Sequence, residues 1–523
     1  MADKLVPGIP HSTRIAILQQ TETASEEDVK DFAAEEAENK HKTVLQYVLS
    51  SDHSRNEVVQ KMNCFHETTF DKPFLTLSGG WRMRCMLASV LIQSPDFMIL
   101  DEPTNFLDLL GVVWLENYLR QLKDTSQTTI ILVSHDRDFV NAVCEEIIIL
   151  RDQKLTYFKG NLSAYEKDFE EQKLYWGRMK EAQERQIAHM EATIRETTKT
   201  GKKTNDDNKL RMAKSRQKKL DDRMGVQVSA TGGRFKLNRD RAGWHSSSRE
   251  EIEVPTDEKG TSLILPDATE LRYPGPLISA EGIVFKYKPN GAPVLDGVDL
   301  VMHMGDRVGL MGLNGCGKST LIRLLVGNAL PTKGKISTHS RLKLGYYAQH
   351  SIEDLQEQGQ TDPNLTALGL MAKETDGTMS EGHLRGLLSS LGLQGRIASD
   401  VRLALAKVIW NSPHLLVLDE ITTHLDFHTV TALASALSSF NGAILLVSHD
   451  RFLVRSVIEG KRDEEHQLDD DFEGIDDEMD ESQSRRRAVY VLKGGKLKEQ
   501  NKGVEQFEQS LVKRVQKMLP AQG

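Results

Sequence analysis

Three scarce or missing features narrow the kind of protein that this chain can be. No apolar run approaches the roughly 18 residues that a membrane-spanning helix needs, and runs such as TIILV and EIIIL have the length of a strand. The N-terminal stretch MADKLVPGIPHSTR lacks the apolar core of a secretory signal peptide. The four cysteines form no C-x-x-C pair, which favours a reducing compartment, the cytosol or the nucleus. We therefore expect a cytoplasmic protein with no membrane segment.

The composition allows two or three globular domains. The chain has 523 residues, of which 39% are hydrophobic and 27% charged. Its formal net charge of -9 hides local asymmetry. The stretch Asp463–Glu481 holds twelve acidic residues and no Lys or Arg, and it predicts a surface loop inserted in the second half.

The chain contains an internal repeat. ILVSHDRDFV at 131–140 matches LLVSHDRFLV at 445–454, and MILDEPTNFLD at 98–108 matches LVLDEITTHLD at 416–426. The matching apolar runs are four to six residues long and end in acids or in Ser-His, as buried parallel strands do. Helical patterns lie between them, so the repeat predicts two α/β halves.

A different pattern separates the halves. Residues 166–224 are rich in strong helix formers, and TKTGKKTNDDN at 198–208 interrupts them, which predicts a helical hairpin. Residues 199–220 hold nine Lys or Arg and two Asp. This is either a solvated linker face or a surface that contacts a phosphate backbone. Residues 225–276 read as an irregular connector. We thus expect a first domain at 1–165 and a second at 277–515.

The second half carries a complete G-x-x-x-x-G-K-[ST] phosphate loop. It follows the strand RVGLM and opens the helix LIRLLVG, which is the context that the motif requires. Glycines let backbone N–H groups close on phosphate, the lysine neutralises its charge and the serine hydroxyl ligates Mg²⁺. The candidate nucleotide-binding residues are Gly312, Asn314, Gly315, Gly317, Lys318, Ser319 and Thr320.

Two further motifs end strands of the second half. LLVLDE places Asp419 and Glu420 at the carboxyl end of a buried strand, where Asp419 would hold Mg²⁺ and Glu420 would act as the general base for water. His449 follows the strand ILLVS and could reach the γ-phosphate. Either motif alone is often structural, but together with the phosphate loop they predict nucleotide chemistry.

These motifs, with LSGG at Leu77–Gly80 and a Gln after a strand, resemble those of ATP-binding-cassette ATPases. Two cassettes joined by a basic helical hairpin, with DEPTNFLD and SHDRDFV, resemble the ABC-F family over essentially the whole chain. The resemblance implies two P-loop α/β cassettes that pair within one monomer, sandwich ATP and Mg²⁺ head to tail, and act on ribosomes in translation or ribosome assembly. The basic hairpin at 199–220 would then contact rRNA or tRNA.

The resemblance also implies residue roles. Tyr287 resembles the aromatic residue that stacks on adenine, Gln349 the glutamine that senses Mg²⁺ and the γ-phosphate, and His449 the switch histidine. Ser78, Gly79 and Gly80 resemble the signature motif that closes on ATP from the opposite cassette. The catalytic set is thus Lys318, Gln349, Glu420 and His449, and the metal set is Ser319, Gln349 and Asp419.

Each half lacks one motif. The spacing from Lys318 to Gln349, counted back from Gln20, falls before Met1, so the first cassette is expected to be truncated and without a phosphate loop. In the second half, Arg396, Ile397 and Ala398 stand at the Ser-Gly-Gly positions. Both losses fall on the same composite site, so one site is expected to survive. Asp101, Glu102 and His135 would then have no ATP of their own.

Several explanations stay open at this stage. The chain is either a natural half-site ATPase or a sequence that lacks an upstream and a short internal segment. Besides an ATPase that acts on ribosomes, it could be a non-hydrolytic ATP-binding regulator or scaffold, because EITTHLD departs from DEPTNFLD. The subunit of a transporter is a further alternative, which the basic hairpin disfavours. The target itself, ribosome or protein partner, is not specified by the motifs.

Overall fold

The computed structural model divides into two compact units, Met1–Asn161 with Gly260–Gly523, and Leu162–Lys259. Each is described by itself. The described residues are 13–18, 79–93, 95–105, 107–151, 153–221, 263–269, 271, 275–349, 351–362, 366–375, 377, 379–391, 400–422, 425, 427–461 and 485–518.

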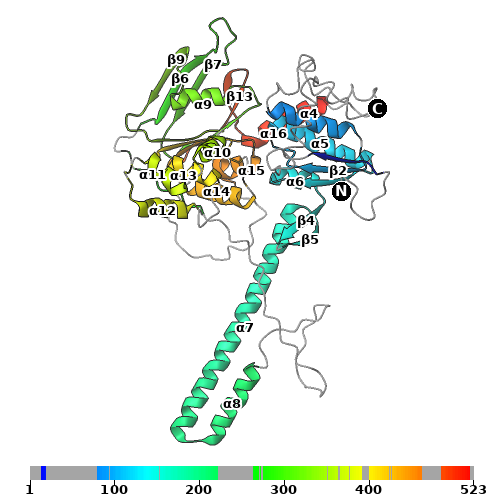
Figure 1. The fold of residues 1–523 in the computed structure, drawn as a ribbon, viewed down its shortest axis with the longest axis vertical. Helices are drawn as coiled ribbons and strands as arrows, with labels where there is room; N and C mark the ends of the chain where they lie inside the picture. The colour runs from blue at the N-terminus through cyan, green and yellow to red at the C-terminus, as the bar shows by residue number, and fades with distance from the viewer. Residues whose placement is uncertain are drawn as a thin grey trace. The chain divides into compact units, whose positions relative to one another are not determined.

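The second half of the chain is built on a six-stranded sheet in the order β10-β11-β12-β8-β13-β14 (Figure 1). All neighbours are parallel except the edge pair β13 and β14. Every residue of β8, β11 and β12 is buried, which explains why these strands are apolar apart from Arg307 and Asp419 at their ends. The strands are β8 (Arg307–Met311), β10 (Leu344–Tyr347), β11 (Leu415–Asp419), β12 (Ala443–Val447), β13 (Arg487–Lys493) and β14 (Lys496–Glu499).

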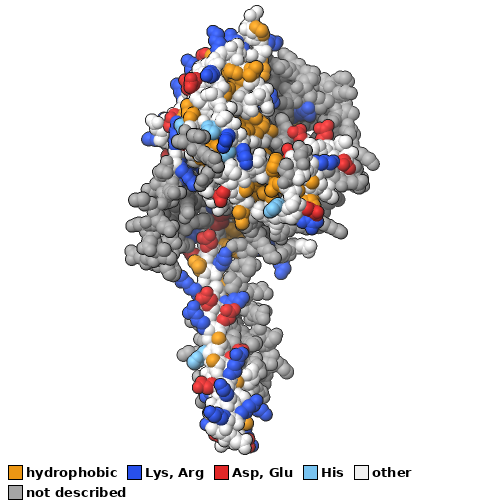
Figure 2. All heavy atoms as spheres, turned by 90° about the vertical axis from the view of Figure 1, so that its left-hand side faces the viewer, with side chains coloured by type: hydrophobic (Ala, Val, Ile, Leu, Met, Phe, Trp, Pro, Cys, Tyr) orange, Lys and Arg blue, Asp and Glu red, His pale blue; other side chains and the backbone are white. Residues whose placement is uncertain are grey.

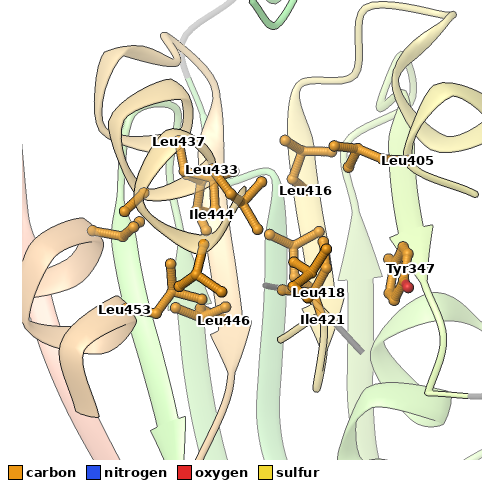
Figure 3. Close-up of a cluster of buried hydrophobic side chains, with 14 of the residues drawn as sticks. Tyr347, Leu405, Leu416, Leu418, Ile421, Leu433, Leu437, Ile444, Leu446 and Leu453 are labelled. Atoms are coloured by element: carbon orange, nitrogen blue, oxygen red, sulfur yellow. The ribbon is translucent and has the colours of Figure 1, made fainter. Parts of the chain in front are cut away.

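Helices pack on this sheet and form a continuous core with it. Leucine and isoleucine side chains of β11 and β12 meet those of α14 and α15 in one apolar cluster (Figure 3). The helices are α9 (Lys318–Val326), α10 (Ser351–Thr361), α11 (Ala367–Glu374), α12 (Glu381–Ser390), α13 (Asp400–Ile409), α14 (Phe427–Ser439), α15 (Arg451–Val454), the π-helical turn η3 (Arg455–Glu459) and α16 (Gly503–Met518).

A separate antiparallel sheet, in the order β7-β6-β9, belongs to the same half. It consists of β6 (Ile278–Phe285), β7 (Leu295–Met302) and β9 (Lys333–Thr338). Its apolar side chains form one cluster with α9 and with one face of the central strands. The phosphate loop therefore lies between two sheets.

The first half repeats part of this plan. A parallel sheet β1-β2-β3 and a hairpin β4-β5 correspond to β10-β11-β12 and β13-β14. The sequence repeat thus predicted two α/β halves correctly. The elements are β1 (Ile15–Leu18), α4 (Gly79–Ile92), β2 (Phe97–Asp101), α5 (Leu109–Thr125), β3 (Thr129–Val133), α6 (Arg137–Val143), β4 (Glu146–Arg151) and β5 (Lys154–Lys159).

The two halves differ where β8 stands. In the second half β8 lies between β12 and β13 and pairs with both. In the described part of the first half, no strand lies between β3 and β4. Val133 of β3 is 50% exposed and Leu150 of β4 is 72% exposed. Apolar side chains that the second half buries are therefore on the surface in the first half.

The second unit contains a helical hairpin, α7 (Leu162–Thr204) and α8 (Asp207–Asp221). Asn205 turns the chain with a left-handed φ of 53°, and Asp206 caps α8 by accepting a hydrogen bond from Asn208 N at 3.0 Å. The expected break at 198–208 is wrong in extent, because α7 continues to Thr204. Threonine hydroxyls along this stretch donate to carbonyls four residues earlier, so the helix accommodates them.

Some expectations fall where the structure gives no description. The acidic stretch 463–481, residues 395–399 at the second signature position, and most of the connector 225–276 lie outside the described residues. The domain boundaries stay predictions. Among the described residues, no helix is both long and apolar enough to cross a membrane.

The aspartate of each SHD motif caps an equivalent helix in its half of the chain. Asp136 accepts a hydrogen bond from Phe139 N at 3.0 Å to cap α6, and Asp450 accepts one from Leu453 N at 3.0 Å to cap α15. Removal from water and, to a smaller extent, the negative charge of Asp136 raise the pKa of Asp450 to about 7. The two carboxyl groups therefore repel each other when both are ionised.

We expect Asp450→Asn to stabilise the protein more at pH 8 than at pH 5. A carboxyl whose pKa is raised in the folded state favours folding at low pH, and this contribution is lost as the pH rises from about 4 through about 7. Asparagine keeps the helix cap but cannot ionise. In thermal unfolding, the gain in Tm over wild type should grow by about 2–4 °C across this range. Asp354→Asn, at an exposed site on α10, is the control; an equal gain at both pH values would contradict the expectation.

Candidate nucleotide-binding site

The phosphate loop joins the end of β8 to the start of α9, as its sequence predicted. Gly317 precedes the helix with a φ of 106°, which favours glycine. A Cβ added to Gly312 would lie 2.7 Å from Cys316 Sγ and 2.9 Å from the carbonyl oxygen of Leu492. Glycine is therefore required for this close packing. A glycine-rich turn that ends at a helix N-terminus directs N–H donors toward an anion.

Lys318 folds back over this loop. Its Nζ donates a hydrogen bond to the carbonyl oxygen of Gly312 at 2.8 Å and lies 3.4 Å from His449 Nε2. The residue is only 6% exposed. A buried ammonium group at the mouth of the loop supplies the positive charge that the phosphates of a nucleotide require.

Glu420 lies at the centre of a polar cluster beside the loop. Gln349 Nε2 donates to Glu420 Oε2 at 3.0 Å, and His449 Nε2 lies 3.4 Å from Glu420 Oε1. His449 Nε2 is also 3.2 Å from Asn314 Oδ1 in the loop. Glu420 has a left-handed φ of 54°, which is uncommon outside glycine and often marks functional sites. The residues chosen from three separate motifs thus come together in space.

The predicted metal ligands also lie at this edge of the sheet. Asp419 ends β11 and is 2% exposed, and Ser319 is exposed in the first turn of α9. Within the described ranges, no group of three or more His, Cys, Asp or Glu side chains is arranged to hold a metal. A hydroxyl, one carboxylate and the amide of Gln349 are hard oxygen donors, which suit Mg²⁺ when phosphate oxygens complete its shell.

Tyr287 follows β6 and lies next to α9. Its hydroxyl is 2.8 Å from Thr320 Oγ1, and its ring packs edge-on against Phe285 with centroids 5.1 Å apart. The side chain is anchored at its hydroxyl, yet the residue remains 64% exposed. An exposed aromatic ring fixed beside the phosphate loop is suited to stack on a base.

One residue of the first half reaches the phosphate loop of the second. Asp108 Oδ2 accepts a hydrogen bond from Asn314 N at 3.4 Å. Asp108 also caps α5 through Gly111 N at 3.1 Å and pairs with Arg84 Nη2 of α4 at 2.8 Å. The loop that ends at Asp108 therefore contacts the phosphate loop of the other half.

The signature motif is only partly described. Gly79 and Gly80 are the first residues of α4, while Ser78 lies outside the described residues. Arg84 belongs to the same helix as Gly79. Its ion pair with Asp108 links the signature helix to the residue that contacts the phosphate loop.

The first half has its own glutamate and histidine in a similar arrangement. Glu102 has a φ of 47°, and its Oε1 lies 3.6 Å from His135 Nε2. Burial raises the pKa of Glu102, although His135 opposes the shift. Asp101 ends β2 as Asp419 ends β11. No phosphate loop accompanies this pair in the described part of the first half.

Sequence reasoning missed two arginines. Arg84 belongs to no recognised motif and lies shortly after LSGG, whereas Arg451 directly follows the SHD motif. The side chain of Arg451 is 8% exposed and contacts carboxylates on three helices. The only signal was an arginine in the same position of both copies, SHDR at 134–137 and at 448–451.

Comparisons with known proteins agree with this geometry. A family model described as ABC transporter matches residues 9–105 and 295–423, and a second model of that description matches 148–233. ATP-binding cassette sub-family F member 2 of Bos taurus is 35% identical over 402 residues, which are 74% of this chain and 57% of that protein. Probable ATP-binding protein YheS of Escherichia coli K12 is 34% identical, over 75% of this chain and 56% of the relative.

The chain thus spans little more than half of the length of these relatives. Among solved structures, an archaeal ribosome recycling factor in complex with a ribosomal stalk protein has a TM-score of 0.52 at 15% identity, covering 95% of this chain and 77% of that one. At this identity the likeness concerns the fold alone, which is that of twin ATP-binding cassettes. The matches to both halves and to the segment between them, together with the sub-family F relatives, lead to one assignment. The chain belongs to the ATP-binding-cassette proteins and, within them, to the ABC-F family.

Proposed function

We propose that this chain hydrolyses ATP at a single composite site and acts on ribosomes in the cytoplasm. The observation that carries the proposal is the hydrogen bond from Asn314 N to Asp108, because it joins the phosphate loop of one cassette to the other. Ser78, Gly79 and Gly80 of the first cassette are the proposed partners for ATP held by the loop at 312–320. The site that is proposed to be missing would need a phosphate loop from the first half and a Ser-Gly-Gly motif at the positions of Arg396, Ile397 and Ala398.

The residues divide the work of hydrolysis as follows. Glu420 takes a proton from the attacking water. The oxygen of that water bonds to the γ-phosphorus, and the bond from the γ-phosphorus to the oxygen that leaves with ADP breaks. Lys318 neutralises the charge on the β- and γ-phosphates, and His449 contacts the γ-phosphate from beside Glu420. Tyr287 stacks on adenine and orients the nucleotide.

Mg²⁺ would be held by Ser319, Asp419 and Gln349, and when bound it would neutralise phosphate charge. Gln349 already contacts Glu420 at 3.0 Å. We propose that Gln349 connects occupation of the metal site to the position of the general base.

The proposal predicts one bound ATP per chain. Equilibrium dialysis of the purified full chain with ATP and EDTA, which prevents turnover, should give a stoichiometry of about one, and Lys318→Ala should weaken binding by at least about tenfold because a buried charge-assisted contact is lost. Lys343→Ala, at a lysine in the turn before β10, serves as the control. Two bound nucleotides would contradict the single-site arrangement.

The two glutamates should behave differently. We expect Glu420→Gln to reduce ATP turnover by about a hundredfold or more, because the general base is lost, and ATP affinity to stay within about threefold. Glu102→Gln is the matched control, since it removes the equivalent carboxylate from the first half, and turnover should be nearly unchanged. Equal losses in the two variants would show that the first-half glutamate also serves catalysis.

The helical hairpin is the proposed surface for ribosomal RNA or tRNA. Exposed basic side chains follow α7 and α8 (Figure 2), namely Lys199, Lys202, Lys203, Arg211, Lys214 and Arg216. Acidic side chains also occur on α7, so the basic character is concentrated near the turn between the helices. Such clusters bind phosphate backbones through release of counterions.

This part of the proposal is tested by co-sedimentation of the Glu420→Gln protein with ribosomes in the presence of ATP. A plot of the logarithm of the binding constant against the logarithm of the salt concentration has a negative slope. Changing Lys202, Lys203 and Arg211 to Gln should reduce the size of this slope by about two to three. The control changes three exposed lysines of β13 and β14, Lys493, Lys496 and Lys498, to Gln. Binding that is insensitive to the hairpin variant would reject this surface, and no ATP-dependent sedimentation would reject the ribosome as target.

One observation favours a second function, a non-hydrolytic ATP-binding regulator. Ile421 follows the general base where the first half has Pro103, and it is completely buried. In this alternative the chain binds ATP but Glu420 does not activate water. ATP turnover that Lys318→Ala abolishes would reject this alternative.

A further inference from the structure

We propose that Arg451 is a positioning residue that places His449 at the ATP site when the first cassette docks. The proposal rests on the proposed function, because it concerns how the position of His449 at the same ATP site is controlled. Arg451 lies two residues after His449 and begins α15. A contact made by its side chain therefore bears directly on the turn that carries the histidine.

Each nitrogen of the Arg451 guanidinium faces a carboxylate from a different helix. Nη2 lies 2.5 Å from Glu116 of α5, Nε lies 3.4 Å from Asp138 of α6, and Nη1 lies 3.3 Å from Glu508 of α16. All three nitrogens of the guanidinium group therefore face carboxylate oxygens. Two of the three carboxylates belong to the first half of the chain.

The network is closed and largely buried. Glu116 and Arg451 each have side chains that are 8% exposed, and Arg455, one turn further, pairs with Asp138 at 3.3 Å and with Glu508 at 2.8 Å. Burial raises the pKa of Glu116, whereas Arg451 opposes this shift. A buried ion pair of this kind is strongly sensitive to the loss of one partner, because the remaining charge stays out of water.

The repeat shows that two acids of this network are not repeated in the other half. The counterpart of Arg451 is Arg137, whose guanidinium lies over the ring of Phe452, 5.3 Å from its centroid. Glu116 aligns with Ala434, and Asp138 aligns with Phe452. Two of the three acidic partners, Glu116 and Asp138, therefore lie in the first half and have no acidic counterpart in the second. The arginine that they hold belongs to the half with the phosphate loop. This asymmetry links docking to the one ATP site that has a complete loop.

The connection to the active site is short. Asp450 caps α15 through Leu453 N, so His449, Asp450 and Arg451 belong to one capped turn. His449 contacts Glu420 and Asn314 on one side of that turn, and Arg451 contacts Glu116 on the other. A change in the position of the first cassette at Glu116 therefore moves the turn that holds His449.

The test is a double-mutant cycle in the full chain. Glu116→Gln is expected to lower the ATP turnover number by about tenfold while ATP affinity stays within about twofold, as expected when a group that orients the transition state is displaced. In a His449→Ala background the same change should have less than about a twofold further effect, because both act through one group. Glu505→Gln, an exposed glutamate that accepts a hydrogen bond from Gln509 on α16, should leave turnover unchanged.

Two outcomes would overturn the proposal. One is turnover of Glu116→Gln within about twofold of Glu505→Gln, and the other is an effect that multiplies fully with that of His449→Ala. If Glu116→Gln fails to fold in thermal unfolding, Asp138→Asn replaces it with the same expectation.

Hydrogen exchange separates this proposal from the proposed function. Amides of residues 449–454 should exchange faster in Glu116→Gln than in wild type, whether or not the protein turns over ATP. If wild type shows no turnover that depends on Lys318, the proposed hydrolysis fails, and the exchange experiment still decides the role of Arg451. Unchanged exchange at these residues would overturn it.

Discussion

The buried parallel sheet of the second cassette is the constraint on which the site depends. Strands β10, β11, β12 and β8 are parallel neighbours, so their carboxyl ends meet at one edge. Gln349, Glu420, His449 and the phosphate loop each follow one of these strands. Their apolar sequences bury both faces of the sheet, and the chemistry is confined to the edge where the strands end.

The same constraint explains why the two halves look alike and differ in chemistry. Glu102 and Glu420 both adopt a left-handed φ and both lie beside a histidine. The second half adds β8 to this frame, and with β8 come the loop and Lys318. In the described part of the first half the corresponding position beside β3 holds no strand, and Val133 is exposed there. The carboxylate and histidine therefore occur in both halves, whereas the phosphate loop distinguishes the half that carries the proposed ATP site.

Contacts between the halves are partly apolar, because Leu109 and Val113 of α5 join the core cluster of the second half, and partly polar. Asp108 and Arg84 connect the start of α4 to the phosphate loop, and Arg451 connects the turn of His449 to α5 and α6. One contact reaches the phosphate loop at Asn314, and the other holds the residue two positions after His449. Charged groups that are held out of water depend strongly on their partners, so such contacts suit an interface whose closure must be sensed.

The sequence by itself determined the two α/β halves, the helical hairpin, and the candidate residues Lys318, Asp419, Glu420 and His449. These follow from local patterns, because strand-sized apolar runs and glycine-rich turns impose their own backbone geometry. The extent of α7 through Gly201 was missed, since threonine side chains and packing against Leu210 compensate for the turn residues. Only the tertiary structure decided that Asp108 meets Asn314 and that Arg451 meets Glu116. These partners are more than 200 and 300 residues apart in the chain, and a single charged side chain carries no sign of a partner at such a distance.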